Sequence, residues 1–204
     1  MTLKRLRLLA VMTALAVVGT LALPSLAQAQ NASLLKPPKG AKLAIVVFED
    51  MQCPLCAHVS PVLDEAARTY KIPLIRYDFP LPMHTWSSEG AILARYFDMT
   101  SKKLGDEFRE RVFKHQIEIT KDNLRAFAEK FATEHKLTLP FVVDPQGKLA
   151  AAVQLDRTLG ERVGINRTPT IYVVSSSRSG EPFVEVKDYR QLYQTIDAMI
   201  AGAK

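Results

Sequence analysis

Cysteine is scarce in this sequence, with two residues among 204, and tryptophan occurs only once. So few cysteines exclude the disulfide-dense scaffolds of small secreted domains and a zinc site built from four cysteines. Histidine is also rare, with four residues scattered along the chain. Beyond residue 29, no apolar run reaches the roughly 20 residues that a membrane-spanning helix needs. These absences favour a soluble domain whose few cysteines serve a specific purpose.

A strong excess of one charge is also lacking. The formal net charge is +6, but three of the 27 basic residues (Lys4, Arg5 and Arg7) lie at the start of the chain. Without them, 24 basic residues face 21 acidic residues, and the net charge is +3. That balance is ordinary for a soluble protein and gives no basis for a nucleic-acid partner. With 48% hydrophobic residues, the chain can bury the core of one domain.

Residues 1–29 have the three parts of a secretory signal peptide. A basic start is followed by an apolar stretch from Leu8 to Leu23 and by the helix breaker Pro24. Ala27 and Ala29 then supply small residues at the two positions that a signal peptidase reads. We expect cleavage after Ala29, although an uncleaved anchor is the alternative. The mature protein would begin with a polar lead-in, residues 30–41, and would be exported.

The apolar periodicity predicts a strand, a helix and a strand, then a helical block, then two strands and a helix. Continuous apolar or alternating patterns indicate strands, and repeats at three and four residues indicate helices. A crossover helix between the first two strands implies that they pair in parallel, and the last two strands read as an antiparallel hairpin. Glu49 and Asp50, after the first strand, are expected to be solvated. The expected strands are 43–48, 74–79, 170–174 and 182–186. The first helix is expected at 54–70, the helical block at 86–163 and the last helix at 189–203. The buried face of the last helix is expected to hold Leu192, Ile196, Met199 and Ile200.

Both cysteines lie in one Cys-x-x-Cys segment, between the first strand and the first helix. A cysteine that caps a helix faces unpaired backbone N–H groups and the positive end of the helix dipole, and both favour its thiolate. We therefore predict that Cys53 is a nucleophile, and that Cys56, one turn further on and more deeply buried, is the resolving thiol. Pro54 suits the first helical turn, where its missing N–H costs nothing.

Other interpretations of the pair stay open to different degrees. A haem attachment site needs histidine directly after Cys56, but residue 57 is alanine. Zinc would need two further ligands, and a disulfide closing so short a loop would stabilise the domain little. Copper binding through both cysteines and a distant histidine is harder to exclude.

A second feature is Thr168-Pro169, just before the third predicted strand. Proline cannot donate to a sheet ladder, so this position demands a special backbone, for which a cis peptide bond is one solution.

Three segments together resemble the DsbA-like thiol–disulfide oxidoreductases of bacterial envelopes. They are Phe48 to Cys56 (FEDMQCPLC), Asp78 to His84 (DFPLPMH) and Gly164 to Ile171 (GINRTPTI). The resemblance implies an α/β, thioredoxin-like fold of order βαβ…ββα, formed by residues 42–82 and 164–204, with a helical insertion at 83–163. It also implies a cis bond at Thr168–Pro169 and a client-binding role for both residues. No cofactor or metal is implied.

The sequence departs from the family pattern at several positions. Pro54 and Leu55, between the cysteines, are expected to tune the redox potential. Leu55 stands where the strongest oxidases carry histidine, so the Cys53 thiolate should be less stabilised and the pair less oxidising. Thioredoxin-like proteins often place a buried acid six residues before the first cysteine, where this chain has Val47. Glu49 and Asp50 are the alternative groups for that proton transfer, although we expect them to form a solvated strand end. Thr168 is shared with envelope isomerases and reductases, which usually carry an N-terminal dimerisation domain. The short lead-in leaves no room for one, so we expect a monomer.

The resemblance therefore predicts a periplasmic enzyme that donates its Cys53–Cys56 disulfide to folding client proteins with free thiols and is reoxidised by a membrane partner. A reductase or isomerase using the same site is the first alternative. A copper-binding or thiol-holding chaperone is another, and a peptide-binding module without redox activity is a third. His84 and Trp86 are expected to pack and cap at the start of the insertion rather than to line a client groove.

Overall fold

The computed structural model describes residues 32–177 and 180–202. The predicted signal peptide, residues 1–29, lies outside these residues. Of the helices that the structure describes, none is both long and apolar enough to cross a membrane.

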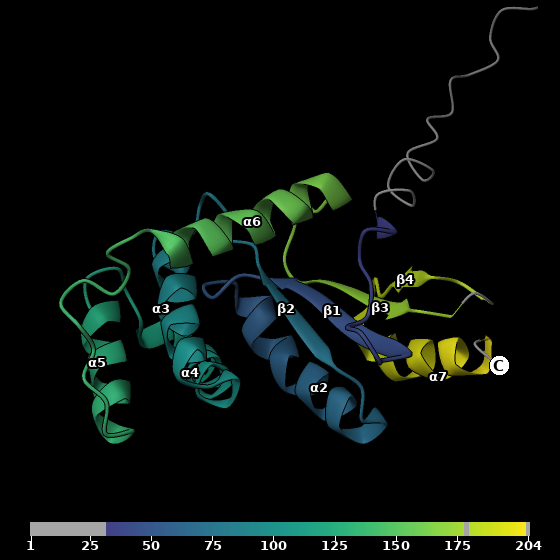
Figure 1. Ribbon diagram of the computed structural model, residues 1–204, viewed down its shortest axis with the longest axis horizontal. Helices are drawn as coiled ribbons and strands as arrows, with labels where there is room; N and C mark the ends of the chain where they lie inside the picture. Colours follow the sequence, from purple (N-terminus) through teal and green to yellow (C-terminus); the bar gives the residue numbers. More distant parts are fainter. Residues whose placement is uncertain (1–31, 178–179, 203–204) are drawn as a thin grey trace, which may run out of the picture.

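A four-stranded mixed sheet forms the centre of the fold, in the order β2-β1-β3-β4 (Figure 1). β1 and β2 pair in parallel, and the helix α2 (Pro54–Tyr70) connects them. β3 pairs antiparallel with both β1 and β4. The predicted order of elements along the chain and both predicted kinds of pairing are confirmed. The strands are β1 (Leu43–Glu49), β2 (Leu74–Asp78), β3 (Thr170–Ser175) and β4 (Phe183–Glu185).

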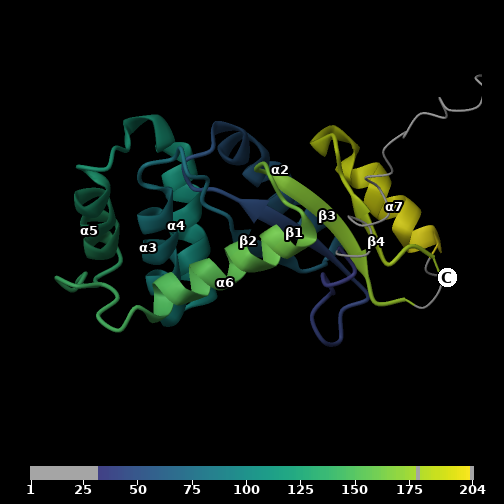
Figure 2. The same ribbon diagram turned by 90° about the horizontal axis from the view of Figure 1, so that it is seen from above.

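Helices cover both faces of the sheet because successive side chains of β1 point to opposite sides. Leu43, Ile45 and Val47 pack against α2 and the last helix, α7 (Leu192–Gly202). The intervening residues of β1 pack against α6 (Lys148–Val163), which runs across the other face (Figures 1 and 2). Since both faces of β1 are covered, the whole strand is buried.

The remaining helices gather at one end of the sheet, beyond β2 (Figure 2). Their core holds Phe97, Phe108 and Phe131, whose ring centroids lie 4.7 to 5.2 Å apart. The repeats at three and four residues in the predicted helical block correspond to buried faces: Leu104, Phe108 and Val112 are buried on one helix, and Leu124 and Phe131 on another, where Phe127 is partly buried. These helices are α3 (Ser87–Thr100), α4 (Lys102–Lys114) and α5 (Leu124–Glu134).

Details at the ends of elements differ from the sequence-based expectations. Gly164, directly after the predicted helical block, caps α6 in the left-handed conformation, with φ of 90°. In α7, however, Ile200 is 37% exposed, so the prediction that it shares the buried face is wrong. The lead-in is not purely polar in its packing, because Ala32 and Leu35 are buried against the face that α6 covers. The domain boundaries stay a proposal.

Candidate active site

The two cysteines lie at the start of α2. Cys53 is the N-cap residue, Pro54 is the first helical residue, and both cysteines are free thiols. Cys53 is 6% exposed and Cys56 is 2% exposed, so Cys56 is the more deeply buried, as expected. Leu55, between them, is 49% exposed. Of the two sulfur atoms, that of Cys53 is therefore the better placed to meet a partner.

The surroundings of Cys53 favour its thiolate. The pKa of Cys53 is lowered to about 5, mainly because the Cys56 thiol donates a hydrogen bond to its sulfur. The hydroxyl of Thr168 and the backbone N–H groups of Cys56 and Leu55 lower the pKa further, whereas burial opposes them. These backbone groups are the unpaired donors of the first helical turn. Cys53 is thus ionised at neutral pH.

Cys56 has the opposite character. Burial raises its pKa, because the charged form would lose its hydration. Its hydrogen bond to Cys53 and the negative charges of Cys53 and Glu49 raise the pKa further. The pair therefore combines one thiolate with one thiol at neutral pH.

The loop that contains Thr168 and Pro169 lies against Cys53. The Thr168–Pro169 peptide bond is cis, and the Cys53 sulfur lies 3.3 Å from the carbonyl oxygen of Thr168. Within residues 32–177 and 180–202, the buried hydroxyl of Thr168 has no conventional hydrogen-bond partner, which leaves it available to the thiolate. Arg167 ties the loop to β4 through a 2.7 Å ion pair with Glu185. The structure thus brings the two predicted site segments together.

Glu49 is buried beside the cysteine pair, and the prediction that it forms a solvated strand end is wrong. Its side chain is only 2% exposed, and its Oε2 atom accepts a 2.6 Å hydrogen bond from Arg76. Its other oxygen, Oε1, is buried without a hydrogen-bond partner in the described part of the chain. Burial raises the pKa of Glu49, although Arg76 opposes this effect. The site therefore holds a buried carboxyl group that can carry a proton.

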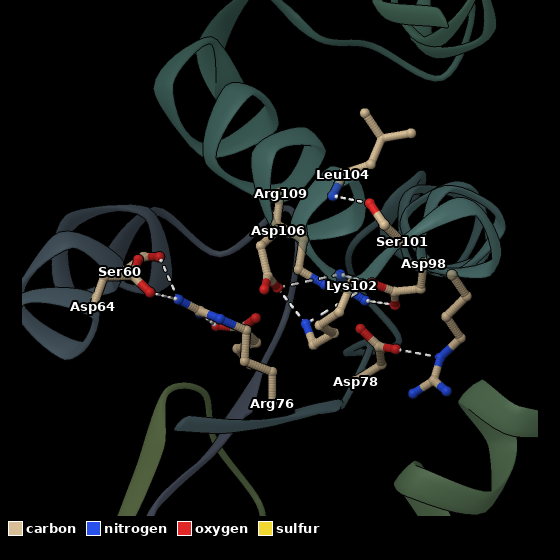
Figure 3. A network of polar contacts seen from close by, with 12 residues as sticks. Ser60, Asp64, Arg76, Asp78, Asp98, Ser101, Lys102, Leu104, Asp106 and Arg109 are labelled. Atoms are coloured by element: carbon tan, nitrogen blue, oxygen red, sulfur yellow. Dashed lines mark hydrogen bonds and ion pairs between the residues drawn. The ribbon is translucent and has the colours of Figure 1, made fainter. Parts of the chain in front are cut away.

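A larger charge cluster supports Arg76 (Figure 3). Arg76 donates 2.9 Å and 3.2 Å hydrogen bonds to Asp64 and Ser60 of α2. On α4, Arg109 makes two hydrogen bonds, of 2.9 and 2.6 Å, to Asp98. Both arginines line a groove of about 710 Å³ between α2 and α4. Arg76 thus connects the buried Glu49 to this groove.

Asp50 is also buried rather than solvated. It is 1% exposed, and its carboxylate is the acceptor for several groups of the segment that enters the helical insertion. His84 contributes Nδ1 at 2.7 Å, and the prediction that it packs at the start of the insertion agrees with this contact. Trp86 is the buried N-cap residue of α3, as expected. The other donors to Asp50 are the backbone N–H groups of Gln52 and Leu81 and the hydroxyl of Ser87.

Gln116 is a site residue that the sequence reasoning missed. It lies 63 positions after Cys53, yet its side chain donates hydrogen bonds to the backbone of the cysteine loop. A glutamine within the predicted helical block carries no chemical signature, so no signal in the sequence distinguishes it.

Comparison with known families agrees with this geometry. A family model described as thioredoxin matches residues 38–198, which is most of the chain. The chain belongs to the thioredoxin family. Among curated proteins, none matches it.

Solved structures of similar fold include several DsbA proteins. Alpha-DsbA1 of Wolbachia pipientis is 18% identical, with a TM-score of 0.66, over 85% of this chain and 96% of that protein. The oxidoreductase NmDsbA1 of N. meningitidis is 21% identical, with a TM-score of 0.58, over 82% and 86%. A periplasmic thioredoxin-like protein of Salmonella enterica serovar Typhimurium is 19% identical, with a TM-score of 0.63, over 83% and 95%. The expected DsbA-like fold, a thioredoxin fold with a helical insertion, is thus confirmed.

Proposed function

We propose that this thioredoxin-family protein is an exported thiol–disulfide oxidoreductase that donates its Cys53–Cys56 disulfide to client proteins. The observation that carries the proposal is the asymmetry of the pair. Cys53 is a stabilised thiolate at the start of α2, next to the Thr168–Pro169 loop, whereas Cys56 is a buried thiol of raised pKa. Nucleophile and resolving thiol need these two different properties.

The exchange begins when a client thiolate attacks the Cys53 sulfur of the oxidised pair. The Cys53–Cys56 bond breaks, a mixed disulfide forms between the client and Cys53, and Cys56 leaves with the electron pair. Because the pKa of Cys56 is raised, its sulfur takes up a proton. Glu49, a buried acid of raised pKa whose charge acts on Cys56, is the group placed to supply it.

A second client thiolate completes the transfer. It attacks the client sulfur of the mixed disulfide and forms the client disulfide, and Cys53 leaves as a thiolate. The lowered pKa of Cys53 makes it a good leaving group for this step. Two electrons have then passed from the client to the pair, and a membrane redox partner would remove them again.

The direction toward oxidation is favoured because a stabilised thiolate stabilises the reduced protein, which makes the disulfide a stronger oxidant. A reductase or isomerase that uses the same site is the second candidate. The exposed Leu55 favours it, because an apolar side chain beside Cys53 adds no hydrogen-bond donor to the thiolate.

Clients would be unfolded or folding proteins with free thiols. We expect an extended client segment to pair with the backbone at Thr168 and Pro169 by strand addition, next to Cys53. The predicted signal peptide supports a periplasmic location, and the Salmonella structure of similar fold is described as periplasmic. We expect a monomer.

Trapping of mixed disulfides tests this proposal. In Cys56→Ala the resolving thiol is absent, so mixed disulfides with periplasmic proteins should accumulate on Cys53. The matched variant Cys53→Ala keeps the buried thiol and should accumulate none. Equal trapping by the two variants would refute the assignment of roles. Equilibration with glutathione buffers then decides the direction: a potential near −120 mV, roughly that of a strong oxidant, supports the donor, and one near about −270 mV supports the reductase.

A further inference from the structure

One side chain of the helical insertion contacts the backbone on both sides of Gln52-Cys53. Gln116 begins the short 3-10 helix η1 (Gln116–Glu118), which follows α4, and it is 9% exposed. Its Nε2 atom donates a 2.9 Å hydrogen bond to the carbonyl oxygen of Met51 and a 3.1 Å hydrogen bond to that of Cys53. An amide group carries two donor hydrogens, so one glutamine serves both carbonyl groups.

These two carbonyl groups determine how Cys53 is presented. Met51 is almost fully buried, so its carbonyl oxygen needs a protein partner in place of water. The carbonyl oxygen of Cys53 also accepts the 3.2 Å hydrogen bond from the N–H of Ala57 that opens α2. Fixing the peptide groups before and after Gln52-Cys53 limits the backbone torsions there. Those torsions direct the sulfur toward the start of α2.

Gln116 itself is held firmly. Ile119, directly after η1, is 5% exposed and packs into the core of the insertion. The side chain of Asn123 donates a 2.8 Å hydrogen bond to the carbonyl oxygen of Glu118. A turn that is anchored in this way can position a neighbouring backbone rather than follow it.

We infer that Gln116 is a positioning residue, which holds the peptide groups around Cys53 so that the sulfur faces the backbone N–H groups of Leu55 and Cys56. The inference rests on the nucleophilic role of Cys53 in the proposed function. It makes the helical insertion a working part of the reactive centre. The insertion therefore positions the nucleophile in addition to covering one end of the sheet.

The variant Gln116→Met tests this role, because methionine has a similar length and volume but no hydrogen-bond donor. The matched control is Gln154→Met, which changes an exposed glutamine of α6 that bonds within its own helix to Thr158. Thiolate absorbance at 240 nm against pH gives the pKa of Cys53 in the reduced protein. We expect Gln116→Met to raise it by roughly half a unit to one unit, the scale of one lost hydrogen bond. The control should leave it unchanged.

The rate of alkylation by iodoacetamide near pH 5 supplies a second readout, and it should fall severalfold in Gln116→Met only. If Gln116→Met does not fold, Gln116→Asn replaces it, since its amide is one methylene too short to reach both carbonyl groups. An unchanged pKa and alkylation rate in the folded variant would overturn the inference. Neither measurement needs a client. Failure of the unmodified protein to exchange disulfides would therefore count against the proposed function and not against Gln116.

Discussion

The lowered pKa of Cys53 predicts an unusual pH dependence of the reduction potential. Between pH 5 and 8.5 the reduced pair holds one proton, on Cys56, because Cys53 is already ionised. Two electrons then travel with one proton, so the potential should fall by about 30 mV per pH unit. Below pH 5 both sulfurs are protonated, and the slope should double to about 59 mV per pH unit.

The size of the effect follows from the same pKa. At pH 7, ionisation favours the reduced form by a factor of about 100 for a thiol of pKa about 5, and hardly at all for one of pKa 8.5. This ratio stabilises the reduced form by about 2.7 kcal/mol and raises the potential by about 60 mV. Because the pKa is lowered, the stabilisation is complete above pH 8.5 and is lost as the pH falls through 5.

The assay is equilibration with glutathione buffers from pH 4 to pH 8.5, with the redox state read by thiol labelling. A slope near 59 mV per pH unit throughout this range would refute the reasoning, because both sulfurs would then be protonated in the reduced protein. A matched pair of variants tests the cause. Cys56→Ala removes the thiol that donates to Cys53 and should raise the pKa of Cys53, whereas Cys56→Ser keeps a donor and should raise it less.

Two further predictions concern a buried acid and a close packing contact. In Glu49→Gln, loss of proton transfer should slow the release of Cys56 by roughly 100-fold, the lower range for a positioned general acid. Stopped-flow mixing of the oxidised protein with a reduced peptide measures this rate. Faster release in the variant would show that Glu49 acts only through its charge. In Gly160→Ala, the added Cβ would lie 2.6 Å from the ring of Phe79, so the variant should be about 1–3 kcal/mol less stable than the control Gly202→Ala, which has open space. Urea unfolding measures this difference, and equal stability would contradict the close contact.

The parts of the fold that the sequence predicts are those set by local pattern. The continuous apolar run at residues 43–48 indicates a strand that is buried on both faces, and helices indeed cover both faces of β1. Cys53 precedes a proline suited to the first helical turn, and it is the N-cap of α2. The error at Ile200 is also local, because the residue lies at the edge of a helical stripe whose neighbours are buried.

The parts that the sequence did not predict depend on distant partners. Glu49 is buried because Arg76 of the neighbouring strand accompanies it, and Asp50 is buried because groups more than 30 residues away donate to it. An acid at the end of a strand looks solvated until such partners are known. Gln116 is the extreme case, since its role depends on the approach of the insertion to a loop more than 60 residues earlier.

The position of Glu49 on β1 explains how this chain can do without an acid at Val47. Residues two apart on a strand point to the same face, so Glu49 follows Val47 toward the cysteines on the face that α2 covers. Arg76 lies opposite Val47 in the parallel register and reaches Glu49 from there. The buried acid of this chain thus lies two residues beyond the Val47 position, on the same face of β1 and roughly 7 Å further along the strand. Its charge still acts on Cys56, which supports the proposed proton transfer between these two groups.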